Sequence, residues 1–88
     1  MMTHILPMET ARIRWACRRG MLELDLFLMR FLDETFETLS DEDKQRFINL
    51  LGQEDPEIFS WLMGQQIPSD PELQLIVNKI RQHGRRTI

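Results

Sequence analysis

Apolar residues along the chain recur at the three- and four-residue spacing of amphipathic helices, with polar residues between them. The clearest case follows Asp70-Pro71-Glu72, where the apolar residues fall at i, i+3, i+4 and i+7: Leu73, Ile76, Val77 and Ile80. No run of alternating β-branched residues favours a strand instead. The pattern predicts an all-α protein, a single small bundle of about five short helices.

Helix start and stop signals divide this pattern into segments. The first two helices are expected over roughly residues 9–18 and 22–38, with Gly20 as the left-handed C-terminal cap of the first. Ser40 is expected to cap a third helix, with Asp43 reaching back to the serine amide. Gly52 and Gly64 are expected to end the third and fourth helices. In each Asp-Pro-Glu, at residues 55–57 and 70–72, the aspartate is expected to cap the following helix, with proline at its first position.

The predicted helices occupy most of the chain, so residues 1–88 are expected to form one domain. Within it, residues 9–83 form the bundle. Residues 1–8 and the basic tail 84–88 lie outside the periodic pattern and are expected to be flexible.

Charge is segregated along a chain whose net charge is -3. Residues 8–20 carry four arginines and one acid, residues 33–57 carry nine acids and two bases, and residues 79–86 carry four bases. The apolar run 22–32 is interrupted by charges and is too short to insert into a membrane. With a single cysteine and no signal-peptide pattern, the expected location is the cytoplasm.

Few residues offer catalytic chemistry. Neither His4 nor His83 has a partner at a metal-ligand spacing, and no glycine-rich nucleotide loop is found. Cys17 shares a helical stripe with Ile13 and Ala16, which favours a buried core residue over a nucleophile. We therefore expect no enzyme, no metal site and no tightly bound cofactor.

One face of the first helix offers an alternative to catalysis, namely binding. Arg12, Trp15 and Arg19 share this side, and exposed tryptophan among arginines is typical of an interface hot spot. A second interpretation stays open, in which Trp15 packs onto the next helix beneath arginine stems. Charges at helix ends could likewise explain Arg18, Arg19 and Glu23 without any function.

The stretch ARIRWACRRGMLELD, residues 11–25, resembles the signature region of the succinate dehydrogenase flavin-assembly factors, the SdhE/YgfY family. Residues 39–44, 55–57 and 59–62 resemble the second half of that family, so the resemblance covers roughly residues 9–83. The family's Arg-Gly-x-x-Glu element falls on Arg19, Gly20 and Glu23.

The resemblance implies a five-helix, non-catalytic protein. It would bind the flavoprotein subunit of succinate dehydrogenase, and that of the related fumarate reductase, and promote covalent attachment of FAD to a histidine of the partner. The expected partner-binding residues are Arg12, Trp15, Arg18, Arg19, Gly20 and Glu23. If Arg19 and Glu23 are surface contacts of a monomer, replacing either by alanine should leave the fold intact.

Two other classes stay open. Members of this family have also been labelled antitoxins, which would make the chain a regulatory protein that binds a toxin. Its arginines could alternatively contact nucleic acid. A pI of about 5.3 and the acidic middle segment weigh against that second alternative.

Overall fold

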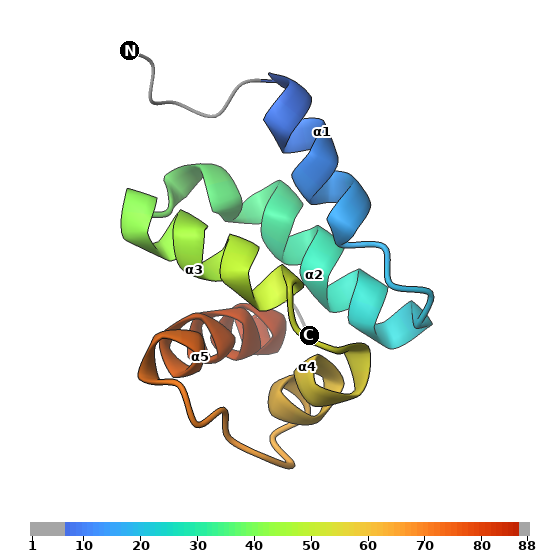
Figure 1. Cartoon of the computed structure of the whole chain (residues 1–88), viewed down its shortest axis with the longest axis vertical. Coiled ribbons are helices and arrows are strands. Elements are labelled where there is room, and N and C mark those ends of the chain that lie inside the picture. Colours follow the sequence, from blue (N-terminus) through green and yellow to red (C-terminus); the bar gives the residue numbers. More distant parts are fainter. Residues whose placement is uncertain (1–6, 87–88) are drawn as a thin grey trace.

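The computed structural model describes the backbone of residues 7–86 and the side chains of residues 11–84. Its helices, in chain order, are α1 (Pro7–Ala16), α2 (Leu22–Glu34), the short 3-10 helix η1 (Phe36–Thr38), α3 (Asp41–Leu51), α4 (Asp55–Leu62) and α5 (Pro71–Arg86) (Figure 1). No strand occurs in this part of the chain. The predicted all-α bundle is confirmed.

Helix α5 organises the bundle, because α2, α3 and α4 all pack against it (Figure 1). Its predicted apolar stripe is buried as expected: Leu73, Ile76, Val77 and Ile80. At the centre, the ring of Phe47 lies 5.4 Å from that of Phe31 and 5.7 Å from that of Phe36. Such tilted ring pairs stabilise a core beyond the area they bury. The bundle is therefore held by one continuous apolar cluster.

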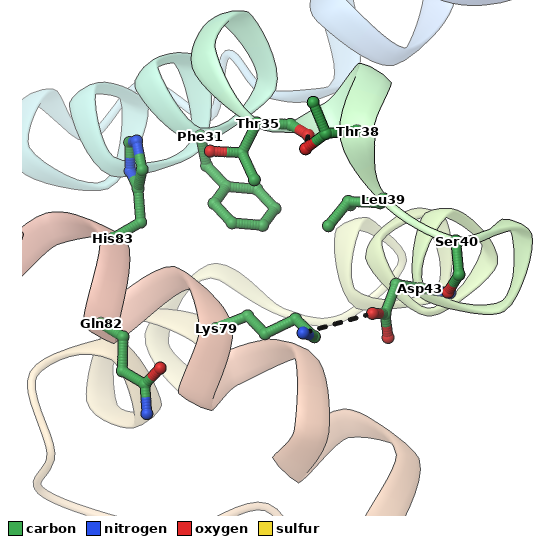
Figure 2. Close-up of a pocket in the computed structure, with 9 residues that line it drawn as sticks. All are labelled: Phe31, Thr35, Thr38, Leu39, Ser40, Asp43, Lys79, Gln82 and His83. Carbon is green, nitrogen blue, oxygen red and sulfur yellow. Dashed lines mark hydrogen bonds and ion pairs between the residues drawn. The ribbon is translucent and has the colours of Figure 1, made fainter.

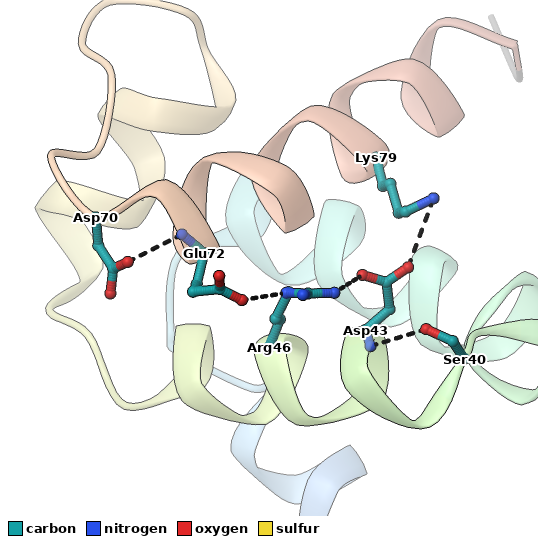
Figure 3. A network of polar contacts seen from close by, with 6 residues as sticks. All are labelled: Ser40, Asp43, Arg46, Asp70, Glu72 and Lys79. Carbon is teal, nitrogen blue, oxygen red and sulfur yellow. Dashed lines mark hydrogen bonds and ion pairs between the residues drawn. The ribbon is translucent and has the colours of Figure 1, made fainter.

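A polar network ties α3 to α5 (Figure 3). Ser40 caps α3 as predicted, since its hydroxyl accepts a 3.1 Å hydrogen bond from the amide of Asp43. The predicted return contact from the Asp43 carboxylate to the Ser40 amide is wrong. That carboxylate instead pairs with Arg46 at 2.8 Å and Lys79 at 3.5 Å, and Arg46 also pairs with Glu72 at 2.6 Å. A buried carboxylate requires such partners, which a local capping box would not supply.

Several helix ends differ from the sequence-based expectation. Helix α1 ends at Ala16, and the second predicted helix is divided at Thr35 into α2 and η1. The expected Asp55 cap is wrong, because Glu54 takes the cap position without a side-chain hydrogen bond and Asp55 already belongs to α4. Asp70 does cap α5, accepting a 2.9 Å hydrogen bond from the amide of Glu72.

Helix α5 continues through Gly84 to Arg86, so these residues are helical where a flexible tail was expected. Glycine inside a helix costs about 1 kcal/mol relative to alanine. Close packing explains it here, because a Cβ on Gly84 would lie 2.9 Å from a ring carbon of Phe27. Pro7 and Met8 belong to α1. The remaining expectations of flexibility, for residues 1–6 and 87–88, lie outside the described residues.

Candidate partner-binding surface

The loop between α1 and α2 carries the Arg-Gly-x-x-Glu element. It leaves α1 through a turn in which the amide of Cys17 donates to the carbonyl of Ile13 at 3.1 Å. Gly20 lies beyond this turn with φ +87°, so the left-handed conformation is confirmed, although Gly20 is not the cap of α1. A Cβ at Gly20 would meet nothing within 4 Å. The backbone conformation, not lack of space, is therefore what favours glycine here.

The side chain of Arg19 turns inward and holds this loop to the rest of the bundle. Its Nε donates to Asp55 Oδ1 at 2.7 Å. Nη1 donates to the carbonyls of Ala16 at 3.0 Å and Leu51 at 2.7 Å, and Nη2 donates to the carbonyl of Gln53 at 2.7 Å. These acceptors belong to the end of α1, the end of α3, the connection after α3 and the start of α4. One guanidinium thus fixes three helices.

Arg19 was expected to be exposed, and that part of the expectation is wrong. Its side chain is only 15% exposed and is paired with Asp55. The carbonyls of Leu51 and Gln53 lie at or just after the end of α3, where backbone acceptors lack intrahelical partners. Arg19 satisfies them from the preceding loop. Its backbone amide also donates to Asp25 Oδ1 at 2.7 Å, which fixes the loop against α2.

The other candidate residues lie on the outside. Trp15 is 74% exposed, which rules out the alternative in which it is covered by α2. Arg12, Arg18, Gly20 and Glu23 are exposed as well. Among the described residues, Glu23 has no ion pair or side-chain hydrogen bond. The end of α1, the loop after it and the first turn of α2 therefore present an aromatic ring, two arginines and one carboxylate that is unpaired among the described residues.

The adjacent arginine, Arg14, does not share this role. Its guanidinium pairs with Asp33 at 2.6 Å and so links α1 to α2. The sequence places Arg12, Arg14 and Arg18 in one basic segment, but only the first and last of them are without an internal partner among the described residues. Charge counts along a sequence cannot make this distinction.

The remaining candidates for chemistry are structural. Burial raises the pKa of the Cys17 thiol to about 12, so the thiol is protonated and poorly nucleophilic at neutral pH. His83 Nε2 lies 2.9 Å from Glu34 Oε1 and its ring packs edge-on against Phe31. In the described part of the chain, no group of three potential ligand residues could hold a metal ion. None of its helices is both long enough and apolar enough to cross a bilayer.

Two hollows lie near His83 on the surface. One has both polar and apolar lining residues, among them Asp43, Lys79, Phe31 and Leu39 (Figure 2). Figure 2 shows Lys79 turned toward Asp43, with which its ammonium group forms an ion pair. The other is a mostly apolar groove of about 360 Å³ whose lining residues include Glu23. Sequence reasoning missed this groove, because residues of α2 and α5 and the residue after α4, which are far apart in the sequence, form it together.

Comparison with known proteins gives the same family over nearly the whole chain. The family model described as "Flavinator of succinate dehydrogenase" (Sdh5) matches residues 11–84. The FAD assembly factor SdhE of Shewanella oneidensis is 55% identical over 74 residues, which are 84% of this chain and 90% of that protein. The FAD assembly factor SdhE of Colwellia psychrerythraea is 46% identical over 78 residues, covering 89% of this chain and 86% of that protein.

A solved structure shares the fold. The solution structure of a UPF0350 protein superposes with a TM-score of 0.76 at 41% identity. The match covers 99% of this chain and 89% of that one. The small helical bundle of this chain is therefore an architecture shared with a solved structure.

Proposed function

The chain belongs to the family of succinate dehydrogenase flavinators, and we propose that it binds the flavoprotein subunit of succinate dehydrogenase and promotes covalent attachment of FAD to it. It acts as an assembly factor, and the flavoprotein supplies the histidine and forms the bond. The relatives' names and the family description favour neither the antitoxin nor the nucleic-acid alternative.

One observation carries the assignment of the contact surface. The loop after α1 is fixed from inside by Arg19, while Trp15 and Glu23 point outward without partners among the described residues. A surface whose backbone is already ordered loses little conformational freedom on binding, which strengthens association. Such a surface can stabilise the one conformation of a partner in which the partner's own reacting groups are aligned.

Each exposed residue then has a distinct role. Trp15 supplies the buried area of the contact, as aromatic residues do at hot spots. Arg12 and Arg18 pair with carboxylates of the flavoprotein, and Glu23 pairs with a cation. Gly20 gives the loop its left-handed turn, and Arg19 positions the loop without touching the partner.

The proposal also covers a second flavoprotein, the oligomeric state and location of the chain, and its relation to FAD. The flavoprotein of fumarate reductase is served by the same surface, and the chain works as a monomer in the cytoplasm. FAD is handled within the flavoprotein and not held tightly by this chain. The buried thiol of Cys17, with its pKa raised to about 12, accords with a protein that supplies no nucleophile.

The test is co-expression with the flavoprotein subunit, followed by flavin fluorescence of the denatured flavoprotein. Glu23→Gln removes the charge and keeps the side-chain size. Glu57→Gln is a matched control, because Glu57 is also an exposed acid in the first turn of a helix, α4. We expect covalent flavin to be lost with Glu23→Gln and retained with Glu57→Gln. Equal flavinylation with both variants, or with the chain left out, would contradict the proposal.

A further inference from the structure

The apolar groove beside Glu23 is lined by two helices, α2 and α5, and by the residue that follows α4. Helix α2 contributes Glu23, Leu26, Phe27 and Arg30, the residue after α4 contributes Met63, and α5 contributes His83 and Gly84. Phe27 and Met63 pack against the buried core. The floor of the groove is thus continuous with the hydrophobic core, and its shape is fixed by the helices around it.

Two glycines lie in or beside the groove, since Gly84 lines it and Gly64 follows the lining residue Met63. Gly84 has no side chain where the ring of Phe27 lies against α5, so the ring seats closely on the helix. Gly64, with φ +79°, lies just beyond Met63, the C-cap residue of α4, and a Cβ there would lie 2.7 Å from Nη2 of Arg81. Both glycines permit a close approach of side chains that a larger residue would prevent.

The opening of the groove leaves apolar surface uncovered. Leu26 is 53% exposed, and Leu22, one helical turn earlier on the same side of α2, is also exposed. Glu23 and Arg30 stand at the ends of the same stripe, and Arg30 lies 4.0 Å from Glu34. Among the residues whose side chains are described, Glu23 therefore has no ion-pair partner and contributes a negative charge at one end of an apolar groove.

We propose that this groove receives a large apolar side chain of the flavoprotein, on a segment that also carries a lysine or arginine to pair with Glu23. The inference rests on the proposed function and extends its contact surface from the loop after α1 along α2. Two observations support it. Glu23 belongs both to the loop surface and to the groove, so one partner covers both, and its charge selects a cation beside the apolar side chain. Met63 suits such a pocket, because methionine adapts to the shape of its neighbour.

A second copy of this chain is the competing occupant. Its Trp15, flanked by Arg12 and Arg18, would offer an apolar ring beside cations. That contact would join two different surfaces, and such head-to-tail contacts generate open chains unless a rotation closes them. It would also cover Trp15, the residue that the flavoprotein needs. The flavoprotein is therefore the occupant we assign.

Binding of the purified flavoprotein subunit to Leu26→Asp, measured by calorimetry, tests the groove. Leu75→Asp is the matched control, since Leu75 is 49% exposed and lies on α5 outside the groove lining. We expect Leu26→Asp to weaken binding at least about tenfold and Leu75→Asp to change it less than about twofold. Circular dichroism of both variants, each at an exposed site, monitors the fold.

The outcomes separate this inference from the proposed function. If Leu26→Asp binds the flavoprotein normally and Glu23→Gln binds it weakly, the groove is not a binding site, whereas the proposed contact surface around the loop after α1 is supported. Absence of binding by the unaltered chain overturns both. As a second measurement, a photo-crosslinking amino acid in place of Leu26 should link to the flavoprotein, at an apolar residue near a lysine or arginine. A crosslink to another copy of this chain, or to a flavoprotein segment without a cation, contradicts the proposal.

Discussion

Replacing Arg19 by alanine should destabilise this protein, although the residue belongs to a surface motif. The change removes four side-chain hydrogen bonds, to Asp55 and to the carbonyls of Ala16, Leu51 and Gln53. Water can reach some of these acceptors afterwards, because the Asp55 side chain is one-third exposed (32%). The loss is therefore smaller than for a fully enclosed ion pair.

The magnitude follows from the kind of bond. A hydrogen bond to a charged group contributes about 1.5–3 kcal/mol net, and bonds that share one guanidinium are not additive. With partial replacement by water, we expect a loss of about 2–4 kcal/mol. A domain of this size melts about 4–8 °C lower for each kcal/mol lost. The melting temperature should therefore fall by at least about 8 °C.

Urea and thermal unfolding followed by circular dichroism measure this loss. Arg18→Ala is the control, because Arg18 is the exposed neighbour and lacks a side-chain partner among the described residues. It should change stability by less than about 0.5 kcal/mol. Arg19→Lys should recover only part of the loss, since an ammonium cannot reproduce the fork of a guanidinium. If Arg19→Ala unfolds at the same urea concentration as Arg18→Ala, the inward role of Arg19 is refuted.

Three further predictions concern the tryptophans, the cysteine and the flavin. Trp61→Ala should lower the free energy of unfolding by about 3–5 kcal/mol, because only 8% of Trp61 is exposed. Trp15→Ala should leave this free energy nearly unchanged and weaken flavoprotein binding. Urea unfolding measures stability and calorimetry measures binding, and a larger stability loss with Trp15→Ala than with Trp61→Ala would contradict the prediction. Burial raises the pKa of Cys17 from 9.0 to about 12, so the protonated thiol stabilises the fold below pH 9. This contribution is lost as the pH rises from 9 to about 12. A Cys17→Ala variant should therefore lose less stability between these two pH values than the unaltered chain, and equal losses would contradict the burial of the thiol. Titration with free FAD should give at most weak binding that vanishes at moderate salt, since exposed charges are screened over about 8 Å at physiological ionic strength; a stoichiometric, salt-resistant yellow complex would show that the chain itself carries flavin.

The parts of the fold that follow local periodicity could be predicted from the sequence. The stripe on α5, the Ser40 cap and the burial of Cys17 all depend on spacing within a few residues, and all are confirmed. The α2/η1 break and the helical Gly84 were not predicted. The position of Gly84 depends on Phe27, a residue far away in sequence that packs against it, and spacing along one helix carries no information about such a neighbour.

The same limit explains why the motif was only partly understood from its sequence. In the sequence, Arg19 and Glu23 are an exposed-looking cation and anion on either side of a glycine. Asp55 likewise reads as a helix cap, because Asp-Pro commonly starts helices. In the structure the expected exposure of Arg19 and the expected Asp55 cap fail for one reason, because the Asp55 carboxylate accepts a hydrogen bond from Arg19. The Asp55 carboxylate is thus paired with a cation instead of with a neutral backbone amide. Packing of α4 against the loop after α1 thus turns Arg19 into a structural residue and leaves Glu23 as the charged group of the motif that a partner can reach.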